Sequence, residues 1–387
     1  MIRTAVLLLF LTVGTNADVQ PESVGETLLT EPQDSWFIAK GTLGPGYIFD
    51  GRDGTMKGLL SLSPWTPSVV RHPDRAELYA AEVHYSRTYR GERTDIVSVI
   101  DHATLTPVAE IPIPNKIASL TFPRYLSLLS DRRLLTVFNM TPAQSVSIVD
   151  TQSRSFLTEL STPGCALTMP VENRGFLMLC GDGTLQLVRL DSKGQEVSRV
   201  RSGAFFSVEN DPVFDQPVSL GDSWQFISFE GLVYEASVDG DIISVTEPWS
   251  VMSDEDVGWR VGGRQIIAVS EMHDLLTVMV HQGGIDTHED PGTEFWVFDR
   301  SSKRRIARVQ VEAPINSMLV TAGDIPLLIA SRALEPVVDV YDIITTKKQR
   351  SINAGEVVGL LLPYCRWIRS SLPLSHSVLP CCLEQLR

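Results

Sequence analysis

The chain has 387 residues, a hydrophobic content of 43%, a charged content of 21% and a formal net charge of −14 at pH 7. This composition allows a sizeable core and excludes wholesale disorder. The acidic balance argues against nucleic acid and anionic membrane surfaces as partners, because both attract clustered Lys and Arg.

The first residues resemble a secretory signal peptide. Arg3 supplies the positive charge, residues 5–13 are apolar, and Thr15-Asn16-Ala17 provides a small-residue cleavage site. The apolar stretch is far shorter than the roughly 20 residues that span a bilayer, so a membrane anchor is the weaker alternative. We therefore expect residues 1–17 to be removed and the mature protein to be exported to a compartment that permits disulfides.

A repeated strand-and-turn unit runs through residues 18–362. Short β-prone runs end in an aspartate and are followed by a polar turn; the aspartates are Asp50, Asp101, Asp150, Asp191, Asp239, Asp299 and Asp342. A period of this length without helical stripes is typical of four-stranded propeller blades. We predict an all-β, seven-bladed β-propeller of four-stranded antiparallel blades; a β-sandwich or two β domains is the alternative.

The aspartates also predict how each unit turns. Their carboxylates can accept hydrogen bonds from the backbone amides of the next turn, which would fix a tight hairpin between the third and fourth strands of a blade. The longest interval, Asp239 to Asp299, contains the polar stretch 281–292. We interpret that stretch as an inserted surface loop.

The five cysteines fall into two groups. Cys165 and Cys180 lie in the middle of the chain, and Cys365, Cys381 and Cys382 lie near its end. We predict a disulfide between Cys165 and Cys180 across adjacent strands, which would stabilise the fold by about 3 kcal/mol by restricting the unfolded chain. Two buried free thiols are the alternative.

The sequence offers no self-contained active site. His281, His288, Glu289 and Asp290 could be considered as metal ligands, but the last three are consecutive and their side chains diverge. We interpret them as part of a solvated loop. Nucleophile elbows, phosphate loops and dinucleotide fingerprints are absent from the sequence. We therefore expect a rigid platform with no catalytic residue and no metal of its own.

Several segments resemble the heavy subunit of the tryptophylquinone amine dehydrogenases, the methylamine and aromatic amine enzymes. The resemblance spans about residues 40 to 360 and is carried by Arg87 to Asp95, Pro142 to Asp150, Gly164-Cys165 with Cys180 to Gly183, Phe206 to Pro212, Pro248 to Asp256, Gly262-Gly263 and Trp296 to Arg308.

The resemblance implies the scaffold of a periplasmic, quinone-dependent amine dehydrogenase. Two heavy and two light subunits would form a heterotetramer, and the tryptophan tryptophylquinone cofactor would belong to the light subunit. The light subunit would oxidatively deaminate a small primary amine to an aldehyde and ammonia. Electrons would pass to a blue copper protein such as amicyanin or azurin.

The resemblance also implies a role for Trp65, which falls where the family has a phenylalanine at the substrate channel. A large ring there could narrow the entrance for the apolar part of an amine, and a structural tryptophan is the alternative. We assign Arg87, Arg90 and Arg93 together to hydrogen bonding in turns and interfaces.

The chain departs from the family after Leu362. The strand alternation and the Asp-turn pattern stop, and residues 363–387 form an atypical tail, which fits an altered reading frame or a divergent end. Such a tail would leave the last blade short of the strands that close the ring, with an open edge. The competing hypotheses are a stand-alone exported ligand-binding propeller and a propeller hydrolase with a central Ca²⁺.

Overall fold

The computed structural model describes residues 28–41 and 44–365. The predicted signal peptide, Cys381, Cys382 and the tail from residue 366 lie outside the described residues. Within the described part, all regular structure is β-strand except one 3-10 turn, η1 (Pro123–Tyr125). None of its helices has the length and apolar character needed to cross a membrane.

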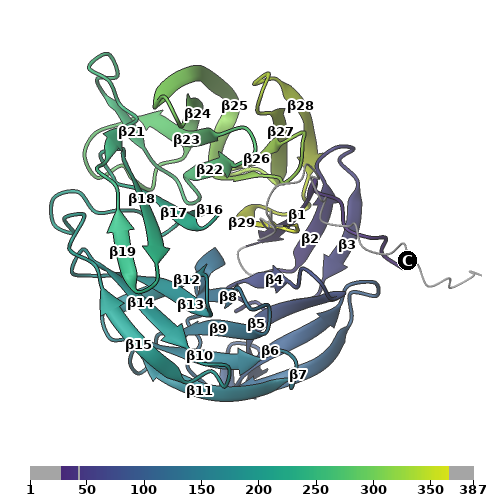
Figure 1. Ribbon diagram of the computed structural model, residues 1–387. Helices are drawn as coiled ribbons and strands as arrows, with labels where there is room; N and C mark the ends of the chain where they lie inside the picture. Colours follow the sequence, from purple (N-terminus) through teal and green to yellow (C-terminus); the bar gives the residue numbers. More distant parts are fainter. Residues whose placement is uncertain (1–27, 42–43, 366–387) are drawn as a thin grey trace, which may run out of the picture.

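The strands form six sheets that are arranged as a ring (Figure 1). The first sheet contains β29 (Val358–Pro363), β1 (Trp36–Gly41), β2 (Gly46–Asp50) and β3 (Met56–Leu60). The second contains β4 (Val69–Arg71), β5 (Glu77–Arg87), β6 (Arg90–Asp101) and β7 (Pro107–Ile113). The third contains β8 (Leu126–Leu128), β9 (Leu134–Asn139), β10 (Ser145–Asp150) and β11 (Ser155–Ser161).

The second half of the chain forms the other three sheets. The fourth contains β12 (Cys165–Val171), β13 (Gly175–Cys180), β14 (Leu185–Leu190) and β15 (Glu196–Arg201). The fifth contains β16 (Val218–Leu220), β17 (Ser223–Ile227), β18 (Leu232–Asp239), β19 (Ile242–Val245) and β20 (Trp249–Ser250). The sixth contains β21 (Trp259–Val261), β22 (Ile267–Ser270), β23 (Leu275–Gln282), β24 (Gly292–Asp299), β25 (Arg304–Val320), β26 (Leu327–Arg332), β27 (Val337–Asp342) and β28 (Lys348–Asn353).

The structure is an all-β propeller with four-stranded antiparallel blades, but the predicted number of separate blades is wrong. The first five sheets are separate blades, and the remaining strands form one eight-stranded sheet, so five separate blades replace the expected seven. The reason is β25, a strand of 17 residues. Its first part pairs with β24 from Arg304 to Gln310, Ile315 lies opposite both Gly292 of β24 and Arg332 of β26, and the rest pairs with β26. One continuous strand therefore joins two four-stranded groups that the repeat predicted as separate blades.

The prediction for the aspartate turns is confirmed at six of the seven positions. Asp50 accepts a hydrogen bond from the Arg52 amide at 2.9 Å, and Asp101 accepts one from the Thr104 amide at 2.8 Å. The same arrangement recurs at Asp150, Asp191, Asp299 and Asp342. Asp239 is the exception, because it pairs directly with Ile242 across a two-residue turn. No turn amide donates to its carboxylate among the described residues.

The core lies between the faces of neighbouring blades. Both faces of the middle strands are covered, so β9 and β10 are buried at every position. This explains why the sequence shows continuous apolar runs rather than strict alternation. Trp224 and Trp296 are the largest fully buried side chains.

The ring closes through the first and last described strands. β29 pairs with β1, with Ile38 opposite Leu362. Beyond β29, Tyr364 is buried, its hydroxyl lies 2.6 Å from His102 Nδ1, and its ring meets Trp36 edge-on at 5.6 Å. The expected lack of a closing strand is therefore not found, because the strand ends at Pro363, just past the point where the sequence pattern stops.

Antiparallel order gives each blade two different ends. Turns between first and second strands and between third and fourth strands lie at one end, which we call the Asp-turn face. Turns between second and third strands, and the crossings to the next blade, lie at the opposite end, which we call the loop face.

Candidate partner-binding face

Exposed apolar side chains gather on the loop face. Among the described residues, large exposed hydrophobic side chains occur in its connections at Tyr89, Leu120, Met140, Val208, Val257, Ile285, Leu334 and Val357. The turns of the Asp-turn face carry Ile325 and Ile344. The other large exposed hydrophobic residues precede β1 (Leu28) or lie on strands, namely Met56, Leu59, Val108, Val197, Ile242 and Ile306. Leu334 and Val257 are 90% and 88% exposed. Apolar side chains that gather on one face of a soluble protein indicate an interaction surface.

Trp65 lies on this face, in the crossing from β3 to β4. Its ring meets Tyr89 edge-on, with centroids 5.9 Å apart and planes at 84°. The ring is half-buried and packs against the core cluster that includes Val83 and Val97. One side of the Trp65 ring thus packs on the core and the other side reaches the surface. This position is compatible with both interpretations of the sequence, a structural tryptophan and a residue at the channel entrance. Its place at a substrate channel stays a prediction.

A buried carboxylate fixes the backbone that carries Trp65. Glu82 accepts a hydrogen bond from the Ser63 amide at 2.7 Å and one from the Thr66 hydroxyl at 3.4 Å. Its other oxygen accepts a hydrogen bond from the Ser98 hydroxyl. Because Glu82 is 5% exposed, these bonds are shielded from water and hold the Trp65 loop in one shape.

Lys40 is the buried cation of this region. Its ammonium group donates to the Gly41 carbonyl at 3.2 Å, and the residue is fully buried. Burial lowers the pKa of Lys40 to about 8, and the carboxylates of Glu356 and Glu82 act in the opposite direction. Lys40 therefore provides a buried positive charge that interacts with the carboxylates of Glu356 and Glu82, rather than a surface charge.

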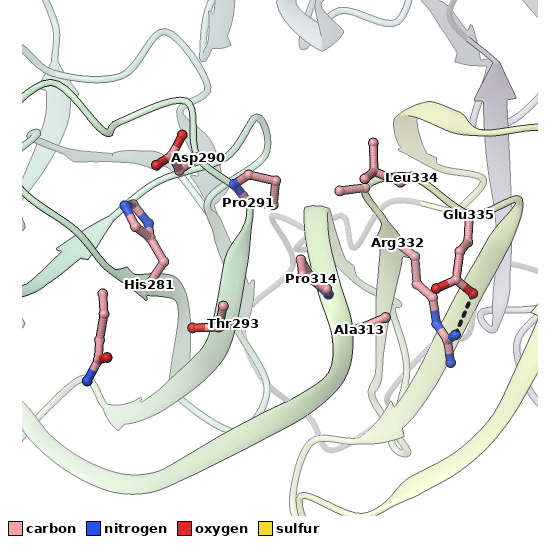
Figure 2. Close-up of a pocket in the computed structure, with 11 residues that line it drawn as sticks. His281, Asp290, Pro291, Thr293, Ala313, Pro314, Arg332, Leu334 and Glu335 are labelled. Atoms are coloured by element: carbon pink, nitrogen blue, oxygen red, sulfur yellow. Dashed lines mark hydrogen bonds and ion pairs between the residues drawn. The ribbon is translucent and has the colours of Figure 1, made fainter.

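A pocket of this face lies between the β23–β24 loop and the β26–β27 turn (Figure 2). Its volume is about 360 Å³, and Pro291, Pro314 and Leu334 supply much of its apolar wall. Arg332 reaches the pocket but pairs with Asp339 and Glu335, both at 2.8 Å. No unpaired cation is therefore found among the lining residues.

His281 borders the same pocket and corrects the interpretation of 281–292 as a solvated loop. His281 and Gln282 end β23, and only 283–291 form the loop. His281 is 3% exposed, and its Nε2 lies 2.9 Å from the Thr287 hydroxyl. Burial lowers the pKa of His281. The imidazole is therefore a neutral packing group of the loop base at pH 7.

Asp290, another residue that the sequence suggested as a metal ligand, lines the same pocket as His281. His288 stacks on Phe229, with ring centroids 4.2 Å apart. Within residues 28–41 and 44–365, no three His, Cys, Asp or Glu side chains are grouped so that they could hold a metal ion. His288 thus connects two neighbouring loops of the loop face.

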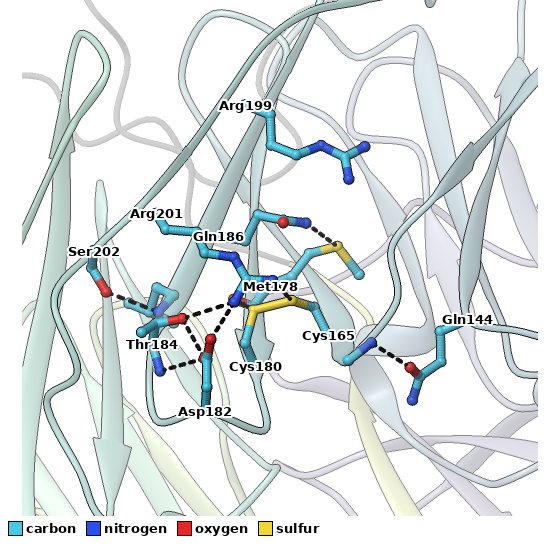
Figure 3. The surroundings of a disulfide bond; sticks show 12 residues. Gln144, Cys165, Met178, Cys180, Asp182, Thr184, Gln186, Arg199, Arg201 and Ser202 are labelled. Carbon is cyan, nitrogen blue, oxygen red and sulfur yellow. Dashed lines mark hydrogen bonds and ion pairs between the residues drawn. A yellow bond between two sulfur atoms is a disulfide. The ribbon is translucent and has the colours of Figure 1, made fainter.

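The predicted disulfide between Cys165 and Cys180 is present (Figure 3). The two cysteines lie directly opposite each other on β12 and β13, at the end of the blade that meets the loop face. Arg201 lies against the disulfide and pairs with Asp182 in the following turn. The disulfide therefore fixes one blade where its loops leave the sheet.

Sequence reasoning missed Glu82 and Tyr89 because neither belongs to a motif with a known chemical role. Glu82 lies within an apolar run, where a carboxylate is unexpected unless it has a partner. Its position in that run is the only feature of the sequence that could have indicated a buried, hydrogen-bonded carboxylate. Tyr89 lies in the tip of the β5–β6 hairpin and only gains meaning when its contact with Trp65 is known.

The fold and this face define a class of protein: a propeller that presents an apolar loop face and, in its described part, no metal-binding cluster. A family model described as methylamine dehydrogenase heavy chain (MADH) matches residues 35–359. The chain belongs to the methylamine dehydrogenase heavy chain family.

Individual proteins agree with the family match. The methylamine dehydrogenase heavy chain of Methylophilus methylotrophus is 27% identical over 359 residues, which cover 87% of this chain and 88% of that protein. The heavy chain of Methylobacillus flagellatus is 25% identical, with 79% and 78% covered. The solved β-propeller domain of Cps50 (Swd1) from Myceliophteria thermophila, at 9% identity and a TM-score of 0.54, covers 84% of this chain and 99% of that domain, and supports the fold alone.

Proposed function

We propose that this chain is the non-catalytic heavy subunit of a periplasmic amine dehydrogenase, in a heterotetramer of two heavy and two light subunits. The observation that carries the proposal is the concentration of exposed apolar side chains on the loop face of a member of the methylamine dehydrogenase heavy chain family. A surface of this kind favours burial against a second chain. The light subunit would cover the loop face around Trp65.

In this proposal the chemistry is divided between two chains. The light subunit would carry the tryptophan tryptophylquinone, which supplies the electron sink for oxidation of a small primary amine to an aldehyde and ammonia. The heavy subunit would bind and orient the light subunit, exclude water from the shared interface, and border the amine channel with the Trp65 ring. Electrons would leave to a blue copper protein such as amicyanin or azurin.

Trp65 suits a border role because it is held rigidly but remains partly accessible. The Glu82 bonds fix its loop, and Tyr89 packs against one side of its ring. An aromatic ring in a fixed position contributes apolar contact to a ligand at a low cost in side-chain entropy.

The test is co-expression of this chain with a light subunit of the same source, including the maturation machinery for the quinone. We expect a stable complex after export, and amine-dependent reduction of a dye by that complex and by neither chain alone. If the chain remains a lone monomer that retains a specific small ligand, the stand-alone binding propeller replaces this proposal.

A further inference from the structure

The tip of the β5–β6 hairpin is the most unusual charged feature of the loop face. Arg87 and Arg90 face each other across the tip, and both are exposed. Neither forms an ion pair with any residue of the described part of the chain. Between them lies Tyr89, which is 65% exposed and reaches the Trp65 ring. Arg87, Tyr89 and Arg90 thus lie together at the end of the hairpin, which we call the arginine tip, and Trp65 borders it.

The structure separates three arginines that the sequence suggested as one group. Arg93 is bound to Asp95 through two hydrogen bonds of 2.6 Å and 2.7 Å. Asp95 is 1% exposed and also accepts a bond from the Ile117 amide at 2.8 Å. Arg93 is therefore used within the chain, to fasten the hairpin base to the next crossing. Arg87 and Arg90 have no such internal use.

The arginine tip is preorganised. Gly91 adopts a φ of +104°, and a side chain there would collide with the Ser86 hydroxyl. The Glu92 amide donates to that same hydroxyl at 3.0 Å. Together with the Arg93–Asp95 pair below, these contacts fix the backbone of the hairpin tip, so the positions from which the two arginine side chains extend are set before binding.

The sign of the charge at the tip contrasts with its surroundings. The chain carries a net charge of −14. Other loop-face connections carry acidic side chains; these are Glu209, Asp211, Asp254, Glu255, Asp286, Glu289, Asp290 and Glu335. The arginine tip is therefore a basic spot on an acidic face. Arginine, tyrosine and tryptophan are also the residue types that contribute most to protein interfaces.

We infer that the arginine tip, with Trp65, is a docking anchor for a carboxylate-bearing surface of the light subunit. The guanidinium groups match carboxylates through paired hydrogen bonds, and the two rings cover the adjacent apolar area. This inference rests on the proposed function, because that proposal supplies the partner. It adds the place of contact and the charge that the partner must present.

The experiment compares two double charge reversals that change the net charge equally. Arg87→Glu with Arg90→Glu alters the arginine tip. Arg52→Glu with Arg304→Glu alters two exposed arginines of the Asp-turn face, Arg52 in a turn and Arg304 at the start of β25, which also form no described ion pair. All four side chains are exposed, so both variants should fold, and matching thermal unfolding confirms this.

Affinity for the co-expressed light subunit is measured by titration from low to high salt. We expect the arginine-tip variant to bind about 10- to 100-fold more weakly, with a reduced dependence on salt, and the Asp-turn variant to bind like the parent. Tyr89→Ala should weaken binding at all salt concentrations. Equal affinities of both double variants and the parent would overturn the anchor. Failure of the parent chain to bind the light subunit would instead overturn the proposed function and, with it, the partner inferred here.

Discussion

On the Asp-turn face, aspartates accept hydrogen bonds from the backbone of the turns that follow them, as at Asp50, Asp150 and Asp342. On the loop face the connections differ from blade to blade, from the short tip of the β5–β6 hairpin to the long crossing between β15 and β16. The Asp-turn face therefore repeats the same turn, stabilised by the same hydrogen bonds, in most blades. The loop face has no repeat, and its connections carry more exposed apolar side chains than the turns of the Asp-turn face, together with the arginine tip.

The difference separates the residues that build the ring from those that could meet a partner. An Asp turn satisfies its own backbone groups, so it has little left to offer to another molecule. The loop face leaves Leu334, Val257 and Tyr89 in water, an arrangement that favours a second surface.

The largest effect is expected from the disulfide below the loop face. Replacing both Cys165 and Cys180 by serine should lower the free energy of unfolding by about 3 kcal/mol, because the unfolded chain is no longer closed over this segment. Chemical denaturation of the variant measures the loss. The parent protein under reducing conditions should show the same loss, and an unchanged midpoint in both cases would contradict a stabilising role.

A smaller effect is expected on the Asp-turn face at Asp150. Hydrogen bonds from Arg133 lower the pKa of Asp150 to about 2, from an ordinary value near 3.8. Because the folded pKa is the lower one, this carboxylate stabilises the fold above about pH 4, and the contribution is lost as the pH falls toward 2. Asp150→Asn keeps an acceptor oxygen for the turn but removes the charge. We expect it to cost about 1 to 2 kcal/mol at pH 7, after allowance for the exposed Arg133.

The measurement is the pH dependence of unfolding for the parent and for Asp150→Asn. The difference in stability between them should be constant near neutral pH and should shrink below pH 4. Two curves that remain parallel down to pH 3 would show that the Arg133–Asp150 contact does not stabilise the fold.

A third prediction compares two aspartates at equivalent positions of the repeat. Asp342 accepts bonds from the Ile344 and Thr345 amides, both at 2.9 Å, whereas no turn amide donates to Asp239 in the described structure. Asp342→Ala should cost about 1 kcal/mol, and Asp239→Ala should cost less than about 0.5 kcal/mol. Equal costs for the two substitutions, measured by urea denaturation, would mean that the turn bonds contribute little.

The sequence predicted the Asp-turn face well and the loop face poorly, for a physical reason. Asp101 and its counterparts act through bonds to residues two or three positions away, so a local pattern is sufficient to find them. Trp65 and Tyr89 are 24 positions apart, and their contact depends on two separate connections that meet only in the folded ring. Chemistry that depends on such distant pairs leaves no periodic signal.

Two predictions about the fold were wrong because they also depended on contacts between distant parts of the chain. The repeat places an aspartate in each unit but does not say whether a turn separates one unit from the next, so the continuous β25 was not foreseen. The pattern stops after Leu362, yet packing continues through Tyr364, because a closing strand is fixed by its pairing with β1 and not by a turn of its own.

The smallest effect on stability, and the clearest separation of the two faces, is expected from exposed apolar side chains. Leu334→Ser with Val257→Ser on the loop face, and Ile325→Ser with Ile344→Ser on the Asp-turn face, should each change the free energy of unfolding by less than about 0.5 kcal/mol. Only the loop-face pair should weaken association with the light subunit, because only that face would become buried in the complex. Thermal unfolding of the isolated chain and titration with the light subunit check the two halves of this prediction. If the Asp-turn pair also weakened association, the light subunit would contact the Asp-turn face. The assignment of partner binding to the loop face would then be wrong.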